Sequence, residues 1–511
     1  MSQDVEVLKG MFGNLTLPKR SGILGLSMGA SLVLVPCFLL SIGFLATQRL
    51  LTAVAAIAVP LVLLALAPIT RAADPSGRSI YRRLMIRFMQ RRKEKSGQAL
   101  YLSGASGHTP DGTTRLPGLL ARAELTEHVG SHDLQFGMIR LSGRGSHLYT
   151  VVLEAFPDGD ALIDEDRLRR YVDHWGAWLS DRSLDENVKA ASVVVESAPD
   201  TGMRLNRLLT SKRAEGAPEF STAVTEAIAE EYSAGSPQVT VKVTVTFDGR
   251  DLGTGKDRGT AEMAEEIGAR LPAIVGGLTT TGAGRVEVCT AQEIVDSTYL
   301  AYDPHAQVAM EEDKLNNGGT GLSWEDVGPT FHYDALDRYA HQRAISASWT
   351  LFDKPEGFFG PRSLQRALDP ISGVMRKRVT LLYRPIPRSQ TAAEAERELK
   401  NSRFAGSQAR DDQRAKNRRD AALKTQQEEA RGAGMTRFGM IVTVTLDGED
   451  PEHAHDELRR LRRQIPQSFS DTRLRLREAL GNEAVTFQAG LPLGLVLPEH
   501  MLLPEDFRRW F

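Results

Sequence analysis

Cysteine is almost missing from this chain, which has only Cys37 and Cys289 among its 511 residues. The first lies within an uncharged stretch near the N-terminus, and the second lies in the charged remainder of the chain. Two cysteines placed in this way cannot form a disulfide framework, so a small disulfide-stabilised secreted domain is excluded. Redox chemistry by a cysteine pair finds no support either.

Complete catalytic motifs are also lacking. The segment Gly253–Lys256 is similar to part of a phosphate loop, but Arg250 occupies the place of its first glycine. Asp257 stands where a Ser or Thr would bind Mg²⁺, and its carboxylate would repel a nucleotide. No dinucleotide fingerprint surrounds the loop glycines at residues 276–277 and 282–284. We therefore expect no catalytic residue, no cofactor and no enzymatic activity; catalysis by scattered residues is the alternative.

Metal-ligand patterns are weak. His453 and His455 are two residues apart on the helix that Pro451 is expected to begin, so their side chains diverge. Asp248 and Asp447 each end a strand, but threonines alternate along both strands. This alternation predicts half-solvated strands rather than the uniformly apolar core strands of nucleotide-hydrolysing folds. The sequence thus predicts no metal site.

Two long stretches near the N-terminus, Ser21–Gln48 and Leu50–Thr70, contain no charged residue, and only Arg49 separates them. At about 1.5 Å per helical residue, each stretch is long enough to cross a hydrocarbon core of about 30 Å. A secretory signal is the competing interpretation, but its apolar region spans only about 7–15 residues and no second span follows it. The pattern predicts an N-terminal segment, residues 1–20, and a two-helix transmembrane hairpin within residues 21–72.

Positive charge flanks the predicted hairpin, whereas its turn holds only Arg49. The positive-inside rule therefore predicts a multi-pass protein of the cytoplasmic membrane, with both termini and the soluble region in the cytoplasm. Residues 73–118 read as a basic juxtamembrane helix and a linker, because apolar and basic side chains mix through residues 79–95 as in an interfacial helix. The residues expected to contact the membrane surface are Arg71, Arg78, Arg82, Arg83, Arg87, Arg91, Arg92, Lys93 and Lys95. Binding of anionic lipid is the functional interpretation, and ordinary topogenic charge is the simpler alternative.

The two parts of the chain carry opposite net charge. Residues 1–95 contain 13 Lys/Arg and 4 Asp/Glu, or +9, whereas the rest contains 50 Lys/Arg and 61 Asp/Glu, or −11. An acidic soluble region is repelled by phosphate backbones, so we expect no direct nucleic-acid binding.

An internal repeat organises the soluble region. Residues 243–251 and 442–450 agree at seven of nine positions, 199 residues apart, and each is a period-two strand that ends in an Asp-Gly turn. Helical patterns follow at Thr260–Val275 and Pro451–Ile465, and strand patterns occur at Ala190–Ser197 and Arg376–Arg384. The predicted fold class is α+β, with two related mixed α+β subdomains, residues 119–320 and 321–511, after the hairpin.

A long charged insertion, residues 391–432, interrupts the second predicted subdomain. Its 10 basic and 8 acidic residues argue against a nucleic-acid patch, and large apolar residues are scarce in it. A helix that is polar all round cannot bury a face, so the insertion either bridges solvent or meets a partner. A solvated helical hairpin is the default interpretation of this insertion, and we expect part of its surface to dock a protein partner.

Several passages carry a resemblance to a known family. Phe12-Gly-Asn14, Pro18-Lys-Arg20, the hairpin and its basic exit resemble the small two-span inner-membrane subunit of type IV secretion and conjugation machines. The remainder, including residues 116–120, 377–384 and 487–494, resembles the N-terminal, non-hydrolysing half of the large ATPase of those machines. The whole chain is similar to an actinobacterial family of membrane proteins found with conjugative elements, in which the ATPase is a separate polypeptide.

The resemblance implies a membrane-anchored structural subunit that docks a separately encoded ATPase at a DNA or protein translocation channel. Its expected partners are that ATPase, other channel subunits, anionic lipid and further copies of the chain. Two alternatives belong to other classes. A membrane-tethered enzyme would need an active site without a known motif, and a scaffold of another secretion system would need a periplasmic domain, which the short turn at Arg49 does not offer.

Overall fold

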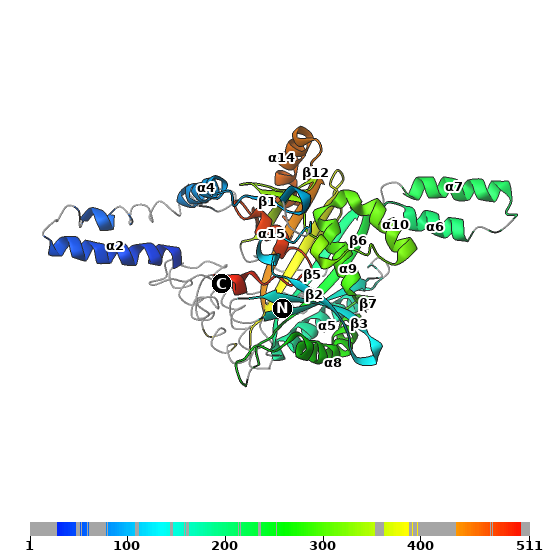
Figure 1. Ribbon diagram of the computed structural model, residues 1–511, viewed down its shortest axis with the longest axis horizontal. Coiled ribbons are helices and arrows are strands. Elements are labelled where there is room, and N and C mark those ends of the chain that lie inside the picture. The colour runs from blue at the N-terminus through cyan, green and yellow to red at the C-terminus, as the bar shows by residue number, and fades with distance from the viewer. Residues whose placement is uncertain are drawn as a thin grey trace, which may run out of the picture.

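The structure is a computed structural model of the whole chain (Figure 1). It describes residues 28–47, 52, 54–58, 60, 78, 80–107, 112–143, 147–157, 159, 163–185, 187–212, 214, 216–233, 237–251, 253–352, 362–387, 391, 396, 436–470, 472 and 474–501.

A large antiparallel sheet forms the centre of the molecule. Thirteen strands belong to it, and eleven of them follow the order β1-β8-β9-β10-β12-β11-β5-β6-β4-β3-β2, while β13 pairs with β10 and β7 pairs with β4. The strands are β1 (Leu100–Leu102), β2 (Glu124–Val129), β3 (Gln135–Ser142), β4 (His147–Phe156), β5 (Val188–Pro199), β6 (Pro237–Asp248), β7 (Arg285–Val288), β8 (Phe331–Asp334), β9 (Tyr339–His341), β10 (Ala344–Leu351), β11 (Arg376–Pro385), β12 (Thr436–Asp447) and β13 (Leu476–Glu478).

Helices lie on both faces of the sheet and project from its two ends (Figure 1). They are α2 (Met28–Ala46), α4 (Ile80–Lys95), α5 (Glu165–Leu184), α6 (Met203–Ser211), α7 (Glu219–Ser233), α8 (Thr260–Thr279), α9 (Ala291–Tyr302), α10 (Gln307–Asn317), α11 (Gln365–Leu368), α14 (Pro451–Ser468) and α15 (Glu483–Ala489). Local sequence explains two helix starts. Thr290 and Glu293 form a capping box before α9, and the Asp450 side chain caps α14, which has Pro451 at its first position.

The sheet consists of two halves with the same strand order. The first half runs β4-α5-β5-α6-α7-β6-α8-β7 along the chain and orders its strands β7-β4-β6-β5. The second half orders the corresponding strands β13-β10-β12-β11, with α14 in the place of α8. Each half therefore has the split βαβ arrangement. The halves join where β5 and β11 pair antiparallel, with Val194 opposite Thr380. The two predicted subdomains therefore share one continuous sheet.

Strand alternation gives the sheet an apolar face and a mixed face. In β12, Val442, Val444 and Leu446 point toward the main core, which α5, α8 and α14 help to form. Thr443 and Thr445 point the other way, yet both are buried. The expectation of half-solvated strands is therefore wrong.

The mixed face is covered by a segment near the end of the chain. α15 and residues 490–497 lie across it with apolar residues of α9, and Thr380 donates a hydrogen bond of 2.7 Å to the Gly490 carbonyl oxygen. Hydroxyl groups on neighbouring strands also bond to one another, at 3.0 Å between Thr150 and Thr246 and 3.1 Å between Ser348 and Thr443. These hydrogen bonds satisfy polar groups whose burial without a partner would destabilise the folded protein.

The predicted transmembrane hairpin is contradicted by the structure. Within the described ranges, none of the helices has both the length and the apolarity that crossing a membrane requires. Of the first uncharged stretch, α2 covers only Met28–Ala46, and the second stretch is described only at residues 52, 54–58 and 60. The fold class is corrected accordingly to a mixed α/β structure with a large antiparallel sheet.

The charged insertion predicted as a docking surface falls largely outside the described residues. Thr391, which is buried, and Glu396, which is exposed, are the described positions within residues 391–432. By contrast, part of the predicted linker is regular structure, because β1 pairs with β8 at one edge of the sheet.

Candidate functional site

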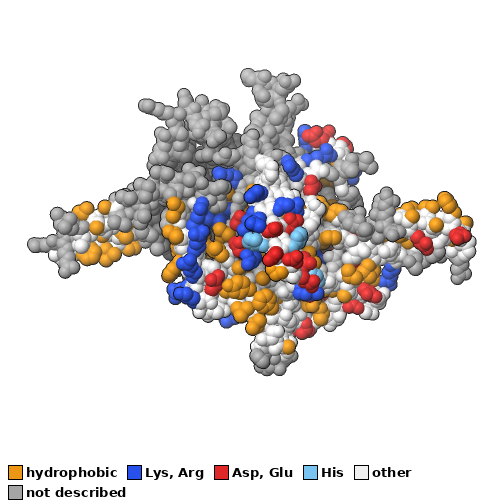
Figure 2. Space-filling model, turned by 90° about the horizontal axis from the view of Figure 1, so that it is seen from above, with side chains coloured by type: hydrophobic (Ala, Val, Ile, Leu, Met, Phe, Trp, Pro, Cys, Tyr) orange, Lys and Arg blue, Asp and Glu red, His pale blue; other side chains and the backbone are white. Residues whose placement is uncertain are grey.

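Helix α4 is the element on which most of the predicted membrane-contact residues lie. It carries seven Lys/Arg and one acidic residue over Ile80–Lys95, and its last turn is basic, which suits the negative end of a helix dipole. Five large apolar side chains of this helix are exposed, and all are more than half accessible: Ile80, Leu84, Met85, Phe88 and Met89. Figure 2 shows a row of Lys and Arg side chains beside hydrophobic ones at this end of the molecule.

The opposite face of α4 is fixed to the second half of the sheet. Buried Gln90 donates a hydrogen bond of 2.9 Å to the backbone oxygen of Asp334 at the end of β8. Lys93 forms an ion pair with the buried Asp334 carboxylate, and the Arg78 guanidinium donates to the backbone oxygen of Glu478 at the end of β13. These contacts hold the helix in one orientation, with its basic and apolar side chains turned outward.

The contacts divide the nine predicted surface residues into three groups. Arg78 and Lys93 bind the protein itself, so they do not belong to the outward face. Arg71 lies outside the described residues. The remaining six are exposed, and they are Arg82, Arg83, Arg87, Arg91, Arg92 and Lys95. We call these six, with the five exposed apolar residues of α4, the α4 outer face.

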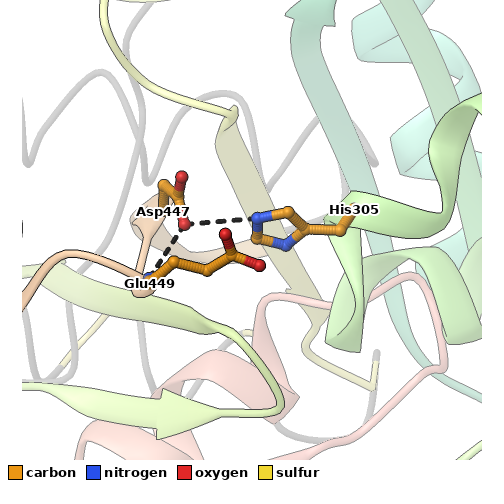
Figure 3. A group of neighbouring side chains, drawn as sticks. All are labelled: His305, Asp447 and Glu449. Atoms are coloured by element: carbon orange, nitrogen blue, oxygen red, sulfur yellow. Dashed lines mark hydrogen bonds and ion pairs between the residues drawn. The ribbon is translucent and has the colours of Figure 1, made fainter.

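A second group of polar side chains was not anticipated from the sequence. His305, in a short 3-10 turn at Pro304–Ala306, lies against the Asp-Gly turn after β12 (Figure 3). Its Nε2 atom is 3.2 Å from Oδ1 of Asp447, and Glu449 completes a set whose possible ligand atoms lie within 4.8 Å of one another. One imidazole and two carboxylates are ligands that Zn²⁺ accepts.

A guanidinium already engages two of the carboxylates at this group. Arg343 lies 3.4 Å from the Glu449 carboxylate and 3.7 Å from that of Asp303, which is in turn 3.8 Å from the Nδ1 atom of His305. A divalent cation would have to compete with this guanidinium. Asp447 and Glu449 are also more than half exposed, so water solvates them. We interpret the group as an ion-pair network that ties the α9–α10 connection to β12.

Two aspartates weighed in the sequence also have partners in the structure. Asp248, at the position in β6 that corresponds to Asp447, lies 2.9 Å from Nζ of Lys189. Asp257 accepts a hydrogen bond of 3.1 Å from the backbone NH of His147, so its carboxylate closes the loop onto β4. His453 and His455 are exposed in the first turns of α14.

A buried histidine lies on the mixed face of the sheet beneath α15. His341 bonds the backbone oxygen of Tyr302 at 2.7 Å and the Ser346 hydroxyl at 2.8 Å, and its ring packs against Phe487. Burial lowers the pKa of His341 to about 3, so the ring stays neutral at ordinary pH. Both ring nitrogens are used in this packing, which makes the residue a structural one.

Comparison with known proteins adds no family to this description. The chain matches no protein-family model, and no curated protein shows significant similarity to it.

Proposed function

We propose that the chain is a membrane-bound docking subunit of a conjugative, type IV secretion-like apparatus, and that it recruits a separately encoded ATPase. The α4 outer face binds an anionic membrane surface, and the acidic remainder of the chain faces the cytoplasm. Hydrolysis belongs to the partner, because this chain has no complete nucleotide-binding motif.

The observation that supports membrane binding is the fixed orientation of α4. A solvent-facing helix normally exposes polar residues, whereas this one exposes five large apolar side chains among its arginines. Apolar insertion and attraction to anionic lipid act together in interfacial helices. α2 lies at the same end of the molecule and also exposes apolar residues, including Phe38 and Leu39 (Figure 1). That end is therefore the one proposed to face the membrane.

The ATPase partner is supported by the resemblance described above and by charge. A region of net charge −11 has no general source of counterion release on DNA, so a protein partner is favoured over nucleic acid.

Removing charge from the α4 outer face should weaken vesicle binding. Each basic residue near an anionic surface contributes about 1 kcal/mol, so Arg87→Gln with Arg91→Gln should lower the partition coefficient about 30-fold. The measurement is flotation of the full chain with vesicles containing phosphatidylglycerol, and with neutral vesicles for comparison. The matched control is Arg459→Gln with Arg463→Gln, two exposed arginines of α14. Equal losses for the two double variants would reject the α4 outer face as the binding surface.

Deleting residues 391–432 should weaken capture of the proposed ATPase partner. The reason is the scarcity of apolar residues in the insertion, which gains little by packing on its own domain. Pull-down with intact and deleted protein, at two salt concentrations, tests this, and urea unfolding establishes that the deletion spares the fold. Undiminished capture would remove the insertion from the interface. Tight DNA binding at physiological salt would contradict the proposed partner class.

A further inference from the structure

Helices α6 and α7 form a hairpin that projects from the sheet at the end opposite α2 and α4 (Figure 1). The hairpin connects β5 to β6 and so extends the strand pair at the centre of the first half. Its base touches α10, where Arg207 lies 3.5 Å from the Asn316 side-chain oxygen. Short helices are marginal in water unless an amphipathic face packs on something. The outer face of α7 should therefore show whether the hairpin packs against a partner.

That outer face is apolar. Phe220, Val224 and Ile228 follow one another at four-residue spacing, so they form one stripe along α7. Phe220 is 81% exposed, and Val224 and Ile228 are 41% and 44% exposed. Ala223 and Ala227, also exposed, flank the stripe and would let another helix approach closely. Hydrophobic side chains gather with acidic ones on this projecting part of the molecule in Figure 2.

The charges of the hairpin are divided between its two helices. α6 contains two arginines and no acidic residue, whereas α7 contains four glutamates and no basic residue. α6 also exposes Leu208, which is 50% accessible. A contact related by a two-fold axis brings each patch of one copy against its complement on the other. If α6 of each copy lies beside α7 of the other copy, the basic helix meets the acidic helix in two symmetry-related contacts.

We propose that two copies of this chain associate through the α6–α7 hairpin and form a four-helix bundle with the apolar stripes inside. Leu208 joins the core of the bundle, and the charges of Arg204 and Arg207 lie at its rim beside the glutamates of the other copy. This inference does not depend on the proposed function, because the hairpin is at the other end of the molecule from the α4 outer face.

Sedimentation velocity of the full chain in mild detergent tests the association. Phe220→Ser removes the largest apolar side chain of the stripe and should raise the dimer Kd at least about 30-fold. Glu226→Ser, a change on the same helix off the stripe, should have little effect. A monomeric wild-type chain at micromolar concentration, or equal effects of these two variants, would overturn the proposal.

Charge exchange separates a second copy from any other occupant. Arg204→Glu should weaken the dimer, and Glu219→Arg should weaken it similarly. Both changes in one chain should restore it, because each helix then meets its complement again. Failure of the double variant to recover would contradict the α6–α7 pairing.

Crosslinking in cells provides a readout free of detergent. Val224 is at the middle of the stripe, so it approaches its own copy whichever way the two hairpins run. In a Cys37→Ser background, Val224→Cys should be crosslinked to a dimer by a short bismaleimide, and Glu226→Cys should not. Crosslinking of Glu226→Cys without crosslinking of Val224→Cys would place the contact on the side of α7 away from the stripe, and would contradict the proposal.

Discussion

Replacing Glu196 with glutamine is expected to destabilise the folded protein by about 3–5 kcal/mol, because it leaves two buried guanidiniums without a counter-charge. Glu196 lies on β5, and its carboxylate binds Arg376 and Arg378 on β11, with 2.7 Å between Nε of Arg378 and Oε2. The two arginine side chains are only 7% and 4% exposed. This ion-pair group crosses the junction between the two halves of the sheet.

The measurement is the free energy of unfolding from urea titration, with the midpoint compared between variants. Glu165→Gln is the control, because it breaks the ion pair of Glu165 with Arg169 on an exposed face of α5. Exposed pairs of this kind contribute at most about 1 kcal/mol. If Glu196→Gln costs no more than Glu165→Gln, the junction does not depend on the buried group.

The same group gives stability a defined dependence on pH. Burial alone would raise the pKa of Glu196, but the adjacent Arg378 and Arg376 outweigh it and lower the pKa to about 2. A carboxyl whose folded-state pKa is lowered stabilises the protein above its ordinary pKa, near 4.5, and that contribution is lost as pH falls toward 2. Stability should therefore decline through this acidic range in the wild type, and less steeply in Glu196→Gln.

Much of the secondary structure follows from local patterns in the sequence. The period-two runs predicted at Ala190–Ser197 and Arg376–Arg384 are within β5 and β11, and the helical patterns beginning at Thr260 and Pro451 are α8 and α14. These elements are predictable because each buries a face whose spacing is set by its own geometry. The repeated segments, 199 residues apart, lie in β6 and β12, which occupy corresponding positions in the two halves of the sheet.

Burial of the threonine face could not be read from the strands themselves. Alternating threonines look solvated when a strand is considered alone, but here residues 490–497, distant in sequence, cover that face. The same limit applies to His305 and Asp447, which are 142 residues apart and meet only because the sheet brings α9 to β12. The stripe on α7 is different, since its four-residue spacing is visible in the sequence and only its exposure required the structure.

The segment that covers the threonine face depends on Gly494, and its replacement by alanine should cost about 2–4 kcal/mol of unfolding free energy. Gly494 has φ +70°, which alanine adopts only with strain, and an added methyl would overlap the Thr150 side chain and lie 2.6 Å from the Thr246 hydroxyl. Gly321→Ala is the matched control, because its φ is +67° but no atom lies near the added methyl. The control should lose only about 1 kcal/mol, which isolates the cost of the overlap.

Adding Thr150→Ala to Gly494→Ala should recover part of the loss in urea unfolding, because it removes the atoms nearest the new methyl. Similar losses at Gly494 and Gly321, with no recovery in the double variant, would mean that this segment does not pack tightly on the sheet.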